Sequence, residues 1–245
     1  MAAHKAGHGP VADSTGHGTG HGAVCGEHPA PKGAADPTPA GGAAPHRPMR
    51  RDAARNHQLV IAAAREVLTE YGTDASMELI ASRAGVGVGT LYRRFPNKEA
   101  LVDEIAGQML GELVAEARSA LALPDGTGLD VFIGVFGHWL SLHRGYADKL
   151  VGRTEAACVE QLRDLIDLLL DQAKAAGRVA AHIELGDVMA LVWGLRGVVE
   201  TSGAVTPDAW RRYADIHLAG LRAHSPASAR PAVTREQLTR INAQG

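Results

Sequence analysis

Residues 66–101 read EVLTEYGTDASMELIASRAGVGVGTLYRRFPNKEAL. Apolar residues recur here at intervals of three and four, the spacing that places side chains on one face of a helix. Ser76 is the expected N-cap of the first short helix. Gly85 can take the positive φ that a tight turn between two helices requires. Pro96 ends the second short helix, because the residue before a proline avoids helical backbone. The stretch therefore predicts a helix-turn-helix, preceded by a helix with Gly72 as its C-cap.

The charge is unevenly distributed along the chain. Residues 49–98 carry eight basic against five acidic side chains, whereas residues 99–224 carry eleven against eighteen. The formal net charge of -2 over 245 residues is therefore an average over a basic and an acidic module. A basic module that contains a helix-turn-helix is a candidate for binding double-stranded DNA.

The order and spacing of several elements closely resemble the N-terminal DNA-binding region of the TetR family of bacterial transcriptional regulators. The resemblance implies a homodimer that binds a palindromic operator and represses transcription until a small-molecule effector releases it. It does not indicate which effector, because the C-terminal part of this family varies greatly. The matching elements are Tyr71-Gly72, Ile80-Ala81, Ala84-Gly85-Val86, Gly89-Thr90-Leu91-Tyr92, Phe95 and Lys98-Glu99-Ala100-Leu101.

The second short helix is expected to contact DNA. Leu91 and Phe95 share the face that packs on the first two helices. Glycines let the helix N-terminus approach a phosphate, hydroxyls bind phosphate, and Arg93 reaches a guanine edge or the backbone. The family often has Ser at position 87 and a polar residue at 88, so readout here shifts toward thymine methyls and Arg93. A solvated face is the alternative for the paired arginines. The expected contact residues are Ser76, Gly87, Val88, Gly89, Thr90, Tyr92, Arg93, Arg94 and Lys98.

Composition divides the chain into four segments. Residues 1–48 hold ten of the 29 glycines and seven of the 12 prolines but no Leu, Ile, Phe, Tyr or Trp, which predicts a disordered tail. Residues 49–101 are the expected DNA-binding domain, and residues 102–224 the expected ligand-sensing and dimerisation domain. Residues 225–245, interrupted by two prolines, are expected to form a second disordered tail.

The folded part is expected to be all-α, because no segment shows sustained strand alternation. Arg50, Arg51 and Arg55 are expected to precede the first helix, where they track the phosphate backbone or minor groove or form a solubilising cluster. Beyond the helix-turn-helix, helices are expected from Asn97 as N-cap to about Leu123, over 129–144, 154–176 and 187–201, and from Pro207 at a first helical position to Ala223.

The helix expected over 187–201 is apolar on two sides, so more than one partner must cover it. A symmetric dimer supplies the second partner, in which this helix and the following one pair with their copies in a four-helix bundle. A single-chain bundle that buries the helix is the alternative. The expected interface residues are Ala190, Leu191, Gly194, Leu195, Gly197, Val198, Trp210, Tyr213 and His217.

A ligand pocket is expected among the large polarisable side chains of the acidic module. Arg196 in an apolar helix suggests an anionic ligand or an ion pair with Glu200. Core packing is the alternative for each residue. The candidate ligand-binding residues are Phe136, His138, Trp139, His143, Trp193 and Arg196.

The alternative function is a metal-responsive regulator or a metal-binding protein. Six of the 12 histidines (His4, His8, His17, His21, His28 and His46) lie in the N-terminal tail, where His17, His21 and Cys25 are spaced by four. Imidazole and thiolate suit zinc, nickel or copper, but flexible glycine-rich segments seldom form a defined site. We therefore assign no metal ligand and no cofactor.

Two further classes are disfavoured by motifs that the sequence lacks. It has no nucleophile elbow, P-loop, dinucleotide fingerprint or zinc-protease helix, so no enzyme activity and no catalytic residue are expected. It also has no apolar run of the roughly 18 residues that span a bilayer, and no signal pattern. We expect a cytoplasmic protein without a membrane partner.

Overall fold

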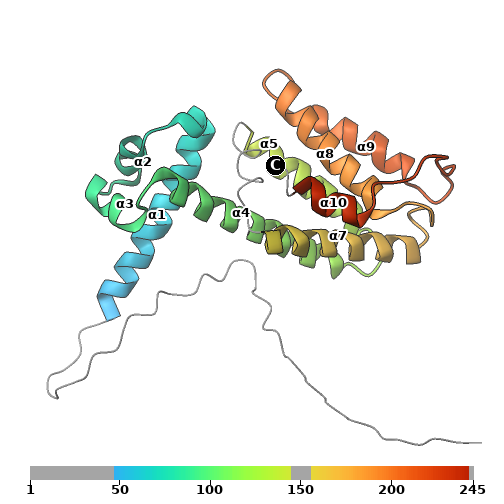
Figure 1. The fold of residues 1–245 in the computed structure, drawn as a ribbon, viewed down its shortest axis with the longest axis horizontal. Helices are drawn as coiled ribbons and strands as arrows, with labels where there is room; N and C mark the ends of the chain where they lie inside the picture. Colours follow the sequence, from blue (N-terminus) through green and yellow to red (C-terminus); the bar gives the residue numbers. More distant parts are fainter. Residues whose placement is uncertain (1–46, 145–155, 243–245) are drawn as a thin grey trace, which may run out of the picture.

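The computed structural model describes residues 47–144 and 156–242 (Figure 1). In these ranges the chain is helical, and its one strand-like feature is an antiparallel bridge between Val179 and Arg222. The predicted all-α fold is confirmed. The elements are α1 (Arg47–Tyr71), the 3-10 turn η1 (Gly72–Asp74), α2 (Met77–Ala84), α3 (Val88–Arg94), α4 (Lys98–Leu121), α5 (Gly128–Leu142), α7 (Ala156–Ala175), α8 (Leu185–Ser202), α9 (Ala209–Gly220) and α10 (Arg235–Asn242).

The caps and turns of the N-terminal module follow its sequence. The Ser76 hydroxyl accepts a hydrogen bond from the Leu79 amide over 3.1 Å, which caps α2. The Asn97 side chain accepts one from the Ala100 amide over 2.8 Å and caps α4. Gly72 and Gly85 have φ of 68° and 66°, the left-handed conformation that ends α1 and α2. These predictions are confirmed.

The described residues form two hydrophobic cores that share α4. The N-terminal core joins α1, α2 and α3 to the first half of α4, from Leu101 to Met109. The C-terminal core begins on the same helix at Leu113 and continues through α5, α7, α8, α9 and α10. Figure 1 shows α4 running from one module into the other. The domain boundary expected at residue 101 therefore lies at the start of a helix that serves both cores.

Ion pairs join the ends of the C-terminal helices. Asp130, in the first turn of α5, accepts hydrogen bonds from Arg222 over 3.0 Å and from Arg178 over 3.5 Å. Arg222 follows α9 and Arg178 follows α7, so one carboxylate links three elements that are distant in sequence. Figure 1 shows α5, α8 and α9 stacked beside one another above α4 and α7.

The C-terminal segment differs from its prediction. Residues 235–242 form the helix α10, and Leu238 of that helix is fully buried in the C-terminal core. The Thr234 amide donates to the Gln237 side chain over 2.9 Å, and the Gln237 amide donates to the Thr234 hydroxyl over 3.3 Å. This reciprocal capping box starts a helix beyond the two prolines. The prediction of a disordered tail is wrong for residues 235–242.

Two helix starts also differ from their predictions. The helix α1 begins at Arg47, so Arg50, Arg51 and Arg55 lie within it rather than before it. A proline in the first turn is compatible with helix, which explains why Pro48 does not delay the start. The helix α9 begins at Ala209 with Asp208 as N-cap, so Pro207 precedes the helix instead of occupying its first turn. No helix within the described ranges is long and apolar enough to cross a bilayer.

Candidate nucleic-acid interface and internal cavity

The helix α3 has a buried face and an exposed face. Leu91 and Phe95 are 1% and 4% exposed and lie in the N-terminal core, as their spacing predicted. Val88 and Tyr92 are 38% and 42% exposed on another face. The buried pair therefore holds α3 against α2 and α4 while the rest of the helix faces outward.

The predicted DNA-contact residues lie on and around α3. All are exposed except Lys98, which is half-buried at the start of α4. A Cβ atom at Gly89 would meet no neighbour within 4 Å, and one at Gly87 would meet only the Thr90 hydroxyl at 3.9 Å. The start of α3 is thus open to a large partner.

Neighbouring side chains engage Tyr92 and Arg94. The Tyr92 hydroxyl donates to a carboxylate oxygen of Glu78 over 3.5 Å, a long contact for a hydrogen bond. The guanidinium of Arg94 lies 6.0 Å from the centre of the Phe95 ring. Arg83, by contrast, is held by Glu70 and Glu66 of α1 and is therefore not a candidate for phosphate binding.

A cavity of about 110 Å³ lies between α4, α5, α7 and α8. Among the residues predicted to bind a ligand, Phe136, Trp139, Trp193 and Arg196 line it. Other parts of its wall are Met109 and Leu113 of α4, Leu162 and Ile166 of α7, and Met189 and Val192 of α8. The wall is thus apolar over most of its area.

Two predicted ligand residues do not line this cavity. His138 is exposed on the outer side of α5. His143 lies behind Trp139, with ring centres 4.9 Å apart, and one ring nitrogen lies 2.8 Å from the Trp139 carbonyl oxygen. Burial lowers the pKa of His143, which favours the neutral imidazole. The predictions for His138 and His143 fail for the same reason. The sequence of a helix as apolar as α5 does not show which of its sides faces a cavity.

Arg163 lines the cavity and was not predicted. It belongs to α7, is 2% exposed, and occupies the same helical face as Ile166. Arg163 is three residues before Ile166 and four after Val159, so the sequence places this cation on the apolar face of the helix. That spacing indicates a buried arginine.

Three predicted interface residues fill the core of their own chain. Leu191, Leu195 and Trp210 are at most 4% exposed. A Cβ at Gly137 of α5 would lie 2.3 Å from the Trp210 ring, so this glycine admits the indole. The expectation that these three residues face a second chain is not met, because α5 and α9 cover the second apolar side of α8.

Some of the remaining predicted interface residues pack within their own chain, and others are exposed to solvent. Gly194 lies against the Tyr213 hydroxyl, which a Cβ at that position would meet at 1.7 Å. Tyr213 stacks on His217 with ring centres 3.8 Å apart, and Val198 is half-buried. The exposed residues are Ala190, Gly197 and His217, together with Ile216, which was not predicted.

No described residues form a group of three or more His, Cys, Asp or Glu side chains that could hold a metal ion. The histidines and cysteine on which the metal alternative depends lie in residues 1–46, outside the described ranges.

Comparison with known proteins adds two family matches. Residues 60–105 match the family described as bacterial regulatory proteins, tetR family. Residues 124–223 match the family described as transcriptional regulator SbtR-like, C-terminal domain. The first match contains α2, α3 and the start of α4, and the second contains α5, α7, α8 and α9.

Two bacterial relatives align with a limited part of this chain. The HTH-type transcriptional regulator YhgD of Bacillus subtilis is 42% identical over 65 residues, which are 26% of this chain and 34% of that protein. The HTH-type regulator SAR0097 of Staphylococcus aureus is 38% identical over 79 residues, which are 31% of this chain and 41% of that protein. These alignments thus span well under half of either relative.

Solved structures align over both modules. A TetR transcription regulatory protein from Mycobacterium vanbaalenii is 31% identical with a TM-score of 0.55, over 71% of this chain and 99% of that one. The TetR regulator SCO0520 from Streptomyces coelicolor is also 31% identical with a TM-score of 0.55, over 69% of this chain and 99% of that one. The exposed helix α3 packs on a helical core, and the likeness extends over nearly the whole of two solved relatives. The chain therefore belongs to the TetR family of bacterial regulatory proteins.

Proposed function

We propose that this protein is a sequence-specific DNA-binding transcriptional regulator. It acts as a homodimer on a palindromic operator and as a repressor that a small-molecule effector releases. The observation that carries the proposal is the division of α3 into a buried face, formed by Leu91 and Phe95, and an exposed face with Tyr92 and Arg93. The exposed face belongs to the basic part of the chain, where attraction to phosphate is strongest.

Each exposed group has a distinct role in this proposal. The hydroxyls of Ser76, Thr90 and Tyr92 and the ammonium group of Lys98 bind phosphates, which position the protein without reading sequence. Arg93 reads a guanine edge, and Val88 contacts a thymine methyl group. Tyr92 exchanges its long hydrogen bond to Glu78 for a phosphate when DNA is bound.

The shared helix α4 supports release by a ligand. Ala106 and Met109 are buried in the N-terminal core, yet both line the cavity. Trp139 lines the cavity too and packs against both cores. An ion pair of 2.8 Å between Arg65 and Glu112 further links α1 to α4. A ligand that displaces these groups shifts α4 and, through it, the orientation of α3.

The exposed faces of α8 and α9 support a homodimer. Ala190 and Gly197 are small residues exposed on α8, and Ile216 of α9 is 56% exposed. Small residues let two helices approach closely, and an exposed isoleucine supplies apolar area to bury. Two copies related by a two-fold axis would present two α3 helices to half-sites about one DNA turn of ~34 Å apart.

Operator binding by variants of α3 and of Lys98, at the start of α4, tests the function. The operator is first sought as an inverted repeat in DNA flanking the gene, and affinity is measured by gel shift at fixed salt. We expect Tyr92→Phe and Lys98→Ala to weaken binding across all sequences, with Lys98→Ala reducing the salt slope by about 1. Arg93→Ala should cost about 1–3 kcal/mol and relax the base preference at one position.

The matched control is Arg118→Ala, which removes an exposed arginine from the last turn of α4. This variant should bind the operator like the unchanged protein. Equal binding by the control and all three test variants would show that neither α3 nor the start of α4 contacts DNA.

A further inference from the structure

A buried arginine lies in the wall of the internal cavity. Arg163 is 2% exposed, and most of the other side chains around the cavity are apolar. Moving a guanidinium out of water is unfavourable unless hydrogen bonds and negative charge replace its hydration.

The guanidinium is held at one end and unsatisfied at the other. Its Nη1 donates to a carboxylate oxygen of Glu160 and, over 3.4 Å, to the Thr239 hydroxyl. Its Nη2 donates to the Leu238 carbonyl oxygen over 3.4 Å. Its Nε is buried and has no hydrogen-bond partner within the described part of the chain. Arginine is always a cation and has no acceptor, so this N–H can be satisfied only by an incoming acceptor.

A second buried N–H donor in the same wall also lacks a hydrogen-bond acceptor within the described ranges. The indole nitrogen of Trp139 is buried without a hydrogen-bond partner among the described residues. Trp139 and Arg163 both line the cavity, and the lining residues include no carboxylate. The cavity thus has cationic and N–H groups in its wall, and an apolar remainder, but no acidic side chain.

We propose that the cavity binds a small apolar carboxylate, which Arg163 anchors. The ligand carboxylate accepts from Arg163, whose planar donor fork matches a carboxylate, while its apolar body packs among Phe136, Leu162 and Trp193. At about 110 Å³ the cavity is smaller than the ~150 Å³ apolar cavity that binds benzene, which limits the ligand to a small molecule. The inference rests on the proposed function, in which this carboxylate is the effector.

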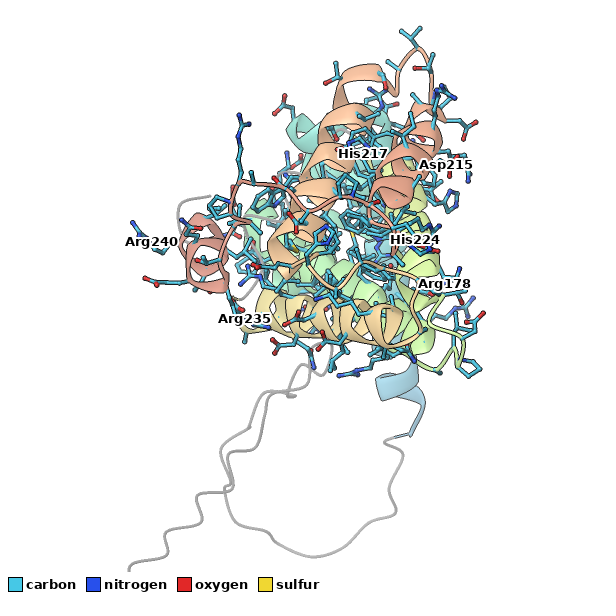
Figure 2. All side chains as sticks on the ribbon, turned by 90° about the vertical axis from the view of Figure 1, so that its right-hand side faces the viewer. Arg178, Asp215, His217, His224, Arg235 and Arg240 are labelled. Carbon is cyan, nitrogen blue, oxygen red and sulfur yellow. The ribbon has the colours of Figure 1, made fainter. Side chains whose placement is uncertain are left out.

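The helix α10 completes the anchor. Its residues Leu238 and Thr239 hold the guanidinium, and Arg235 ties the helix to α7 through Asp164 at 2.7 Å and Asp167 at 3.3 Å. Figure 2 shows Arg235 on the side of α10 that faces α7, with Arg240 directed away from the body of the protein. Residues 235–242 lie beyond the segment 124–223 that matches the family, so the family match does not include this part of the site.

Tryptophan fluorescence of the full chain tests the anchor, because Trp139 and Trp193 line the cavity. The probes are two matched pairs of acid and alcohol: phenylacetate with 2-phenylethanol, and hexanoate with hexan-1-ol. We expect the acid of at least one pair to bind about tenfold more tightly than its alcohol. In Arg163→Met the acid should lose this advantage, while the alcohol binds nearly as before. Arg240→Met removes an exposed arginine from α10, is the control, and should keep the preference.

Several outcomes overturn the proposal. It fails if the unchanged protein binds neither acid, if it binds acid and alcohol equally, or if Arg163→Met keeps the preference. Should Arg163→Met not fold, Arg163→Lys retains a cation but not the fork, and an undiminished preference in that variant contradicts the anchor. Operator binding is measured without any probe in parallel. If the unchanged protein does not bind the operator, the proposed function is refuted. If it binds the operator but shows no preference for the acid, only the ligand assignment is refuted.

Discussion

Arg83 of α2 and Glu70 of α1 form a bidentate ion pair, in which Nη1 donates to Oε1 and Nη2 to Oε2, each over 2.8 Å. Parallel hydrogen bonds from a planar guanidinium constrain direction as well as distance. The pair therefore holds α2 at a fixed orientation on α1, and α3 packs against that unit. The hydrogen bonds from Arg83 lower the pKa of Glu70 below its ordinary value of 4.5.

Removing the Glu70 charge should make stability less dependent on pH. A carboxylate with a lowered pKa stabilises the folded state above its unfolded-state pKa, and this contribution is lost as the pH falls through the folded-state value. We expect Glu70→Gln to lower the free energy of unfolding at pH 7, with the difference from the unchanged protein shrinking below pH 4.5. Urea unfolding from pH 3 to pH 8 measures it.

Glu116→Gln is the control for this series, because Glu116 is exposed on α4. The free-energy difference for that variant should stay close to zero across the same pH range. A Glu70→Gln difference of the same size at both ends of the range would contradict the ion-pair account.

A methyl group at Gly137 should destabilise the C-terminal module. The Cβ would lie 2.3 Å from the Trp210 ring, which is buried and cannot move without disturbing the packing of α9. We expect Gly137→Ala to lower the free energy of unfolding by about 1–3 kcal/mol, the usual cost of overpacking. Urea unfolding measures the change.

Gly134→Ala is the matched control, because it lies one turn earlier on the same helix and its Cβ would meet nothing within 4 Å. Alanine is the better helix former, so this variant should gain roughly 0.5–1 kcal/mol. If both variants were equally stable, Trp210 would not pack against α5 as the structure shows.

Loss of the Asn97 cap should weaken the start of α4. Its side chain accepts from the Ala100 amide over 2.8 Å, and removing such a cap costs about 0.5–2 kcal/mol. We expect Asn97→Ala to show this loss in thermal or urea unfolding. Asn97→Asp keeps an acceptor at the cap and should recover most of the stability. An Asp variant as unstable as the Ala variant would assign the loss to something other than capping.

An arginine at Gly197 should prevent dimerisation. Gly197 is exposed, and a Cβ there would meet none of the described residues within 4 Å, so the backbone has room for a side chain at this position. A charged side chain at the centre of a close helix contact is incompatible with the proposed bundle. We expect sedimentation to give twice the chain mass for the unchanged protein and the single mass for Gly197→Arg.

Ala115→Arg places the same charge on an exposed position of α4 and should remain dimeric. The proposed interface is wrong if Gly197→Arg also sediments as a dimer, or if the unchanged protein is a monomer at micromolar concentration.

Local features were predictable because neighbouring residues determine them. Ser76 and Asn97 cap the helices that follow them, Gly85 takes the left-handed conformation, and Leu91 and Phe95 point into the core. Caps, turns and helix periodicity are interactions over a few residues, so the amino-acid sequence alone determined the all-α fold and the position of the helix-turn-helix. The capping box at Thr234 is of the same kind, because it joins residues three apart and starts a helix downstream of the two prolines.

The tertiary structure decided which side of each apolar helix faces a partner. Leu195 and Trp210 are apolar, so either a core or a dimer interface could bury them. The packing of α5 and α9 shows that they lie within the core of their own chain. Arg163 becomes part of a cavity because α10, 75 residues further on, supplies the carbonyl group that holds its guanidinium. Such contacts join segments that are distant in sequence, and their geometry depends on how whole helices stack rather than on any local pattern.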